Sequence, residues 1–396
     1  MLDFSHNELI RTIPSEIANI NGLKMIMLGS NTLSGTIPSQ LGFLRNLKTL
    51  DLEGNHLSGF IPNSFSGLWN IDILNLSEND ISGNIPTELG ELTTLTVLKL
   101  QGNELAGTIP TYIGNLDKLK WLMLAVNNLN GTIPSELGKL SMVNSLWLFS
   151  NNLTGSIPYE IGLMNGLIVL YLDSNNLTGT IPSFEVGSLA SLEVFHVSRN
   201  MITRSIPASI GNLNKLNSII LTNNLLDGTI PDEIGNLKDL MNFMIDDNKL
   251  SGSIPQSIGN LHQLEYLYLG NNSIIGTLPD VIANLSRLIE LTANDNIIEG
   301  TIPSQIGMLL NARDVKLENN QLSGTIPSSF GLLSQLTSLT LQNNAFNGTI
   351  PSEMGMMVSL TYLDISENSL IGSVPDQLCV NGVEVHPTVA IACSCC

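Results

Sequence analysis

Apolar residues recur at fixed positions along almost the whole chain. In segments such as 50–52 and 98–100, two leucines flank one variable residue, so apolar side chains alternate with a period of two. This alternation predicts a short β-strand with one face turned inward. An asparagine follows the second leucine by three residues, as Asn55 follows Leu52. Asparagine favours turns, and its side-chain amide can bond backbone groups of neighbouring segments.

A proline marks the same point in every repeat. Sixteen prolines, from Pro14 to Pro375, follow one another at intervals of 24 residues, except for one interval of 25 between Pro182 and Pro207. An asparagine stands seven residues before each of them, and in fourteen repeats a glycine follows that asparagine by four residues. The proline ends the extended segment, and the glycine indicates a tight backbone. One such coil cannot bury its leucines alone, but stacked coils bury each other's.

The repeat contains the run Asn-x-Leu-x-Gly-x-Ile-Pro-x-x-Leu-Gly and resembles the plant-type leucine-rich repeat over about residues 1–378. The resemblance implies an α/β-type repeat solenoid, a right-handed leucine-rich repeat superhelix with a parallel concave β-sheet and about sixteen 24-residue repeats. Similar proteins are ectodomains of receptor-like kinases and receptor-like proteins, secreted polygalacturonase inhibitors and repeat proteins of algae. They imply a non-enzymatic protein whose concave face recognises a protein, a peptide or a glycan.

Both ends depart from the repeat. The chain begins inside a coil, so we expect a signal peptide and an N-terminal cap to be missing; the alternative is a repeat protein with a bare end. Residues 379–396 are similar to the C-terminal caps of extracellular leucine-rich repeat proteins, which predicts a solenoid over 1–378 and a separate cap. That segment holds all four cysteines, Cys379, Cys393, Cys395 and Cys396. They favour a disulfide-stapled cap and an extracellular or cell-surface location, and a zinc site with His386 is the weaker alternative.

Charge excludes several classes of function. Only 13% of the residues are charged, and 35 acidic residues against 16 basic ones give a net charge of −19. A nucleic-acid binder needs clustered lysine and arginine, so this class is excluded, and the acidic body favours neutral or basic partners. No run reaches the roughly 18 apolar residues of a membrane span. The chain therefore contains no span of its own, although the resemblance is compatible with part of a membrane receptor.

The variable residue at the centre of each strand is the best candidate for function. Seven consecutive members of this column, from Met123 to Tyr268, are apolar, aromatic or histidine. A stripe of large side chains facing solvent marks an interaction surface, and aromatic anchors suit binding hot spots. The alternative is that aromatic residues favour strands and cover one another. The predicted ligand-binding residues are Trp121, Met123, Trp147, Phe149, Tyr171, His196, Met244, Tyr266 and Tyr268, and the predicted polar rim is Glu290, Arg313, Asp314, Lys316 and Asp364.

A longer coil interrupts the repeat in mid-chain. Residues 183–187 carry one residue more than their equivalents, and Arg204 replaces glycine in the next turn. Drift among repeats explains this, and a local bend that presents a basic spot is the alternative.

Catalytic chemistry finds no support. The five histidines lie in different repeats, without the grouping of nucleophile, base and orienting acid that acyl transfer needs. The sequence indicates no cofactor and no metal site, although weak calcium binding at Asp246 and Asp247 remains open.

Surface features leave other functions open. Of the seven Asn-x-Ser/Thr sites, Asn130 and Asn347 are the predicted glycan carriers. A column of threonine and serine before each Ile-Pro, including Thr108 and Thr180, could bind ice on a flat surface. The leading function is recognition of a protein, peptide or glycan ligand by a monomeric chain. Inhibition of a polygalacturonase is the runner-up, and a structural or adhesive role is a third possibility.

Overall fold

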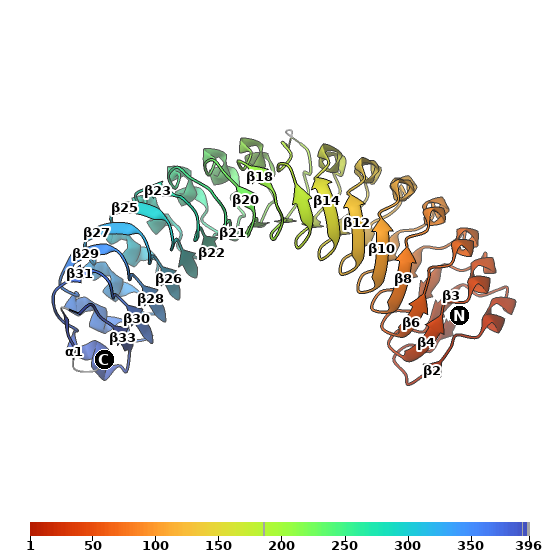
Figure 1. Cartoon of the computed structure of the whole chain (residues 1–396), viewed down its shortest axis with the longest axis horizontal. Helices are drawn as coiled ribbons and strands as arrows, with labels where there is room; N and C mark the ends of the chain where they lie inside the picture. Colours follow the sequence, from red (N-terminus) through yellow and green to blue (C-terminus); the bar gives the residue numbers. More distant parts are fainter. Residues whose placement is uncertain (185–186, 390, 394–396) are drawn as a thin grey trace. The chain divides into compact units, whose positions relative to one another are not determined.

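The computed structural model describes residues 1–184, 187–389 and 391–393, so two residues of the longer coil, Glu185 and Val186, and two of the cap cysteines, Cys395 and Cys396, lie outside the described residues. The chain divides into two compact units, residues 1–202 and 203–396. Each is built from repeated coils stacked in chain order (Figure 1). No described helix is long and apolar enough to cross a membrane.

A first row of short strands forms a parallel sheet in each unit. In residues 1–202 the row is β1 Leu2–Asp3, β3 Met25–Met27, β5 Thr49–Asp51, β7 Ile73–Asn75, β9 Val97–Lys99, β11 Trp121–Met123, β13 Ser145–Trp147, β15 Val169–Tyr171 and β17 Val194–His196. In residues 203–396 it is β19 Ser218–Ile220, β21 Asn242–Met244, β22 Tyr266–Tyr268, β24 Glu290–Thr292, β26 Asp314–Lys316, β28 Ser338–Thr340, β30 Tyr362–Asp364 and β33 Glu384–His386. Each strand pairs with the next coil in register, as Leu98 does with Leu122 and Leu122 with Leu146. The predicted solenoid of leucine-rich repeats is confirmed.

A second row of parallel strands follows the asparagine turns, and the sequence pattern did not reveal it. In residues 1–202 it is β2 Ile10–Arg11, β4 Thr32–Thr36, β6 His56–Gly59, β8 Asp80–Asn84, β10 Glu104–Thr108, β12 Asn128–Thr132, β14 Asn152–Ser156 and β16 Asn176–Thr178. In residues 203–396 it is β18 Thr203–Arg204, β20 Leu225–Leu226, β23 Ile275–Gly276, β25 Ile297–Thr301, β27 Gln321–Thr325, β29 Ala345–Gly348 and β31 Ser369–Leu370, with β32 Gly372–Ser373 paired to β34 Ile391–Ala392.

Short 3₁₀ helices return the chain to the next coil and lie along the edge of each unit opposite the first row (Figure 1). In residues 1–202 they are η1 Ser15–Asn19, η2 Ser39–Phe43, η3 Asn63–Gly67, η4 Thr87–Glu91, η5 Thr111–Asn115, η6 Ser135–Lys139 and η7 Tyr159–Leu163. In residues 203–396 they are η8 Ala208–Asn212, η9 Asp232–Asn236, η10 Gln256–Asn260, η11 Asp280–Asn284, η12 Ser304–Met308, η13 Ser328–Leu332 and η14 Ser352–Met356. The repeated proline caps each of these helices in an extended conformation, as Pro134 does for η6 with ψ of 133°. This conformation suits a residue that ends a strand and begins a helix.

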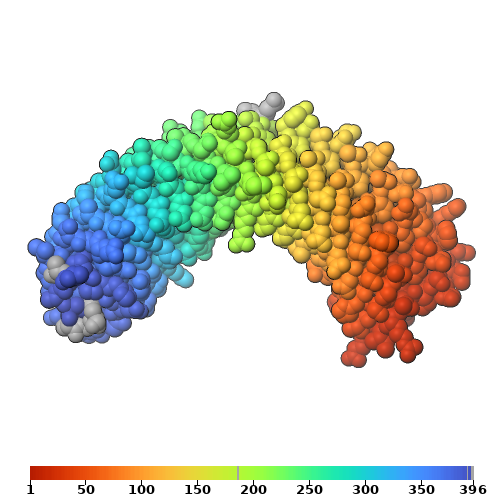
Figure 2. Space-filling model, in the orientation of Figure 1, coloured from red at the N-terminus to blue at the C-terminus, as the bar shows by residue number. Residues whose placement is uncertain are grey.

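The core lies between the strand rows and the 3₁₀ helices. Leu98, Leu122 and Leu146, at the strand centres, are completely buried, and Leu100 and Leu105 from the flanking turn join them. Burying one leucine contributes roughly 1.5–3 kcal/mol, and every coil repeats the contribution. Side chains fill the space between neighbouring coils in each unit (Figure 2).

The repeated asparagine joins two consecutive coils. The Nδ2 group of Asn127 donates to the carbonyls of Leu124 (3.2 Å) and Ala125 (3.1 Å) in its own turn. It also donates to Leu100 (3.0 Å) one coil earlier, while its Oδ1 accepts the backbone N–H of Leu105 at 2.9 Å. The prediction that this amide bonds a neighbouring coil is confirmed. These bonds give partners to backbone N–H and C=O groups of the turns that would otherwise be buried without one.

The repeated glycine occupies a left-handed backbone position. Gly131 has φ of 72°, and a Cβ there would lie 2.8 Å from the Thr108 methyl of the preceding coil. At the two turns where arginine replaces glycine, the backbone keeps the same conformation, with φ of 72° at Arg11 and 68° at Arg204. Stacking therefore dictates the backbone even where the residue disfavours it, at a cost of roughly 1–2 kcal/mol.

The last segment covers the final coil. It contains α1 Asp376–Val380 and the strands β33 and β34, and it buries Leu378 and Val385. Cys379 and Cys393 are disulfide-bonded. This arrangement gives the last leucine-rich coil a neighbour, as the end of a solenoid requires.

Candidate functional site

The first-row strands of residues 1–202 bring the predicted aromatic residues together. Met123, Trp147, Tyr171 and His196 are paired in register on β11, β13, β15 and β17. The leucine or phenylalanine before each of them points into the core, so these side chains point outward. Trp147, Tyr171 and His196 are half-buried rather than enclosed.

An aromatic cluster occupies this face. The ring centroids of Trp147 lie 6.0 Å from Phe149 and 5.9 Å from Tyr171. Phe149 and Tyr171 meet edge to face at 6.1 Å, and Tyr171 meets His196 edge to face at 5.7 Å. These are favourable separations for aromatic pairs, which support one another and limit each other's rotation. We call Trp147, Phe149, Tyr171 and His196 the aromatic cluster.

Two further candidates flank the cluster and differ from each other. Trp121 is 43% exposed, and the ammonium of Lys99 lies 5.6 Å from its ring centroid. Met123 is only 8% exposed, because its neighbours cover it. Trp121 therefore offers an open ring, while Met123 supports the surface from beneath.

His196 lies between an acid and a hydroxyl. Its Nε2 is 2.7 Å from the Ser198 hydroxyl oxygen, and its Nδ1 is 3.4 Å from an Asp173 carboxylate oxygen. No such grouping around any histidine was expected from the sequence. Asp173 reaches His196 because their two coils stack, whereas Ser198 follows His196 by two residues in the same coil. Ser198 is 7% exposed, which restricts the approach of a substrate carbonyl. Burial lowers the pKa of His196; Asp173 opposes this effect, and the Arg199 charge adds to it.

The face of residues 203–396 carries a second, smaller group. Met244 and Tyr268 are paired in register, and the rings of Tyr266 and Tyr268 meet edge to face at 6.3 Å. The Tyr268 hydroxyl donates a hydrogen bond to Glu290. Burial raises the pKa of Tyr268, and its hydrogen bond to Glu290 raises it further. The hydroxyl therefore remains a neutral donor that holds the ring in place.

Several polar residues beside this group pair with one another. The Thr222 hydroxyl donates to Asp246 at 2.8 Å, and burial raises the pKa of that carboxyl group. Lys316 pairs with Asp314 at 3.1 Å in the predicted rim. Within the part of the chain that the structure describes, no group of three or more histidine, cysteine or acidic side chains is arranged to hold a metal ion.

Comparison with protein families identifies the repeat. Two family models, both described as leucine rich repeat, match the chain. One matches residues 21–81 and 165–226, and the other matches 94–116, 118–140, 263–285, 311–333, 335–357 and 359–381. The chain belongs to the leucine-rich repeat family. Its repeats are of the plant type, as their consensus implies.

Solved structures of leucine-rich repeat proteins resemble the chain closely. The plant peptide hormone receptor RGFR1 in complex with RGF2 has 35% identity and a TM-score of 0.96, over 99% of this chain and 63% of that one. The ectodomain of the Arabidopsis receptor kinase HAESA, in complex with an N-terminally extended IDA peptide hormone ligand, has 34% identity and a TM-score of 0.89, over 99% of this chain and 66% of that one. The chain therefore spans about two thirds of these receptor ectodomains.

The likeness extends beyond plants. The leucine-rich repeat protein LIC12759 of Leptospira interrogans has 30% identity and a TM-score of 0.75, over 97% of this chain and 94% of that one. No curated protein matches the chain. The structural neighbours thus include peptide-binding receptor ectodomains, and this kind of fold is typical of non-enzymatic ligand-binding proteins.

One surface escaped the sequence analysis. A groove crosses the coils from Thr108 to Pro182 beside the second strand row, and exposed Tyr159 lines it. The sequence showed the threonine column. It did not show that the ring of Tyr159 and the carboxylates of Glu136 and Glu160 line the same groove, because these residues belong to the next segment of each coil.

Proposed function

We propose that the chain recognises a peptide through the outward side chains of its first strand row. The likeness to ectodomains solved with peptide hormones supports this proposal. The single observation that carries it is the aromatic cluster, in which four rings from three adjacent coils contact one another and remain half-buried. Such anchors contribute large contact areas at a small cost in side-chain entropy.

Trp147 also leaves a polar atom without a partner. Its Nε1 donor is buried and makes no hydrogen bond within the described chain. An unpaired buried donor costs roughly 1–3 kcal/mol, and a ligand carbonyl recovers that cost where binding turns the ring and exposes Nε1. The net charge of −19 favours basic peptides through long-range attraction. Recognition is then the docking of an extended, neutral or basic peptide onto a rigid surface.

Peptide selection tests this function directly. A random peptide library displayed on phage is selected on the folded chain, and the Kd of each enriched synthetic peptide is measured by calorimetry. Replacing Trp147 and Tyr171 together by alanine should weaken binding well over tenfold, because each hot-spot anchor contributes about 2 kcal/mol.

The matched control is Trp69→Ala. Trp69 is 60% exposed and stacks beneath Arg45, away from the aromatic cluster, so its replacement should leave Kd unchanged. Selected peptides that bind the double variant as tightly as the original chain would remove the aromatic cluster from the proposal. Failure to enrich any peptide would remove peptide recognition itself.

We also propose an extracellular or cell-surface location, with the C-terminal cap held by its disulfides and glycans on Asn130 and Asn347. Both asparagines are exposed, whereas Asn75, in another Asn-x-Ser site, is buried.

The inhibitor alternative has its own test. Slower hydrolysis of polygalacturonate by a polygalacturonase after addition of the chain would favour inhibition over peptide recognition.

A further inference from the structure

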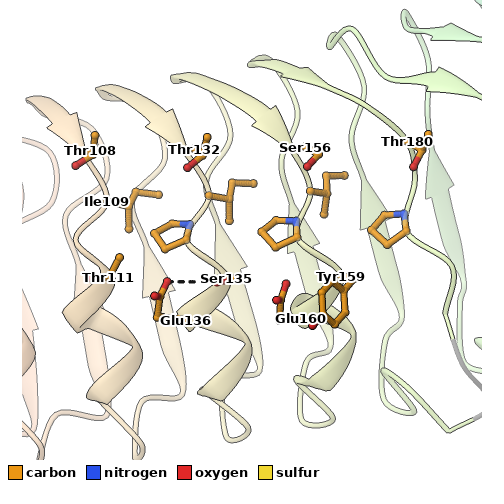
Figure 3. A pocket seen from close by; sticks show the side chains of 15 residues that line it. Thr108, Ile109, Thr111, Thr132, Ser135, Glu136, Ser156, Tyr159, Glu160 and Thr180 are labelled. Atoms are coloured by element: carbon orange, nitrogen blue, oxygen red, sulfur yellow. Dashed lines mark hydrogen bonds between the residues drawn. The ribbon is translucent and has the colours of Figure 1, made fainter.

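A groove of about 760 Å³ lies on residues 1–202, away from the aromatic cluster. It runs between the ends of the second-row strands and the beginnings of the 3₁₀ helices, across four consecutive coils (Figure 3). The proposed peptide site does not include any residue of this groove. Its lining must therefore be explained separately.

One wall is a row of free hydroxyl groups. Thr108, Thr132, Ser156 and Thr180 stand one per coil, all exposed (Figure 3). Their hydroxyls make no hydrogen bond within the described residues, whereas the buried polar groups of the asparagine turns are satisfied. The Thr108 methyl is packed against Gly131 of the next coil, which holds the side chain in place. The row is thus an ordered set of donors and acceptors turned toward solvent.

The floor and the opposite wall have different chemistry. Buried Ile133 and Ile157 form part of an apolar floor. Opposite the hydroxyls stand Tyr159, which is 73% exposed, and the half-buried carboxylates of Glu136 and Glu160 (Figure 3). Glu160 makes no hydrogen bond or ion pair within the described chain, and Glu136 accepts only a long bond of 3.5 Å from the hydroxyl of its neighbour Ser135. No lysine or arginine lines the groove among the described residues.

This combination fits a carbohydrate. A sugar ring presents an apolar C–H face to an aromatic ring or an apolar floor, and a rim of hydroxyls to acceptors and donors. Neighbouring coils stand about 4.8 Å apart, close to the advance per sugar of an extended β-linked chain. Carboxylates without a balancing cation would repel an acidic polymer and accept hydrogen bonds from a neutral one.

We infer that this groove binds an extended neutral polysaccharide, with Tyr159 as the stacking platform and the hydroxyl row and the two glutamates as hydrogen-bonding partners. The equivalent groove of residues 203–396 supports the assignment by contrast. It is lined by Thr301, Thr325 and Ser328 among others, but by no aromatic or acidic residue in the described chain. The threonines belong to the repeat. A smaller groove of residues 1–202 also has a ring and a carboxylate, Phe60 and Glu88, but the groove at Tyr159 combines its ring with two carboxylates and a row of hydroxyls.

Calorimetry with cellohexaose, a neutral β-linked hexamer, tests the proposal on the whole chain. We expect saturable binding, a loss of at least tenfold with Tyr159→Ala, and retention of most binding with Tyr159→Phe, which keeps the ring. Glu160→Gln should change affinity less than the loss of the ring, because an amide still accepts hydrogen bonds. A hexamer of galacturonic acid should bind at least tenfold more weakly than cellohexaose.

Two control variants separate this groove from other surfaces. Phe43 is 70% exposed but does not line the groove, so Phe43→Ala should bind cellohexaose normally. The double Trp147→Ala, Tyr171→Ala variant should also bind it normally, which distinguishes failure here from failure of peptide recognition. Circular dichroism confirms that each variant is folded.

Three results would overturn the proposal. The first is no binding of cellohexaose, or of hexamers of xylose and mannose, at millimolar concentration. The second is binding that Tyr159→Ala leaves unchanged. The third is inhibition of ice recrystallisation that persists in Tyr159→Ala while no hexamer binds, which would assign the hydroxyl row to ice.

Discussion

His196 shows how one residue acquires its properties from neighbours in other coils. Its ring contacts Tyr171, its Nε2 meets the Ser198 hydroxyl and its Nδ1 faces Asp173. Burial disfavours the imidazolium, and the carboxylate of Asp173 only partly offsets this effect. Among the charged groups around it, Arg199 also lowers the pKa. The folded chain therefore holds His196 neutral at pH values where a free histidine begins to take up a proton.

This shift makes stability depend on pH. The pKa of His196 is lower in the folded state than the ordinary 6.5, so the unfolded state binds more protons between these two values. Above about pH 7.5, His196 is neutral in both states and folding is not penalised. As the pH falls through 6.5 toward the folded pKa, protonation of the unfolded state lowers the free energy of unfolding. Urea unfolding of the chain and of His196→Gln, measured from pH 8 to pH 5, should show the original chain losing more stability on acidification. Parallel curves for the two proteins would contradict this prediction.

At the scale of the element, the coil is held by its turn as much as by its leucines. The asparagine amide supplies bonds that the backbone of a tight turn cannot make for itself, and it reaches the preceding coil through both its N–H group and its oxygen. The turn residue is thus the connection between neighbouring coils. Its loss should be felt beyond the coil that contains it.

Asn127→Ala tests this connection. The substitution leaves the buried N–H of Leu105 without its partner and removes one of the hydrogen bonds to the carbonyl of Leu100, and we expect a loss of about 3 kcal/mol in the free energy of unfolding. Asn128→Ala is the matched control, since Asn128 is the next residue and its side chain is exposed; its change should stay within about 0.5 kcal/mol. Both are measured by urea denaturation, and equal effects of the two substitutions would refute the role assigned to the turn.

At the scale of the whole molecule, the stability of a repeat protein is a sum over coils and the contacts between neighbours. Each coil depends on those beside it, so the two ends need protection more than the middle. The C-terminal segment gives this protection by burying Leu378 and Val385 against the last coil, and we expect its disulfides to hold it there. Disturbance of the cap should therefore remain local.

Reduction of the disulfides tests this locality. We expect faster amide hydrogen exchange in β33, β34 and the coil at residues 359–378 after treatment with a reductant, because a disulfide of this kind contributes roughly 2–4 kcal/mol. Exchange in β9 to β13 should stay the same and serves as the internal control. Unchanged exchange at the C-terminal end would mean that packing alone holds the cap.

The repeat, the class of fold and the outward direction of the aromatic residues could all be predicted from the chain alone. Each is a local property: alternation, a turn residue and a period decide which side chains can be buried, whatever lies far away. Leu122 in the core and Trp147 on the surface follow from their places in one coil.

Contacts between coils required the folded structure. The contact of Asp173 with His196, the burial of Met123 and the groove lined by both Tyr159 and Thr132 depend on residues of different coils. Their distances depend on register, on side-chain rotamers and on neighbours that cover or expose them. A repeat states which residues occupy one column of the stack, but only packing brings a particular acid, ring or hydroxyl within bonding distance of its neighbour.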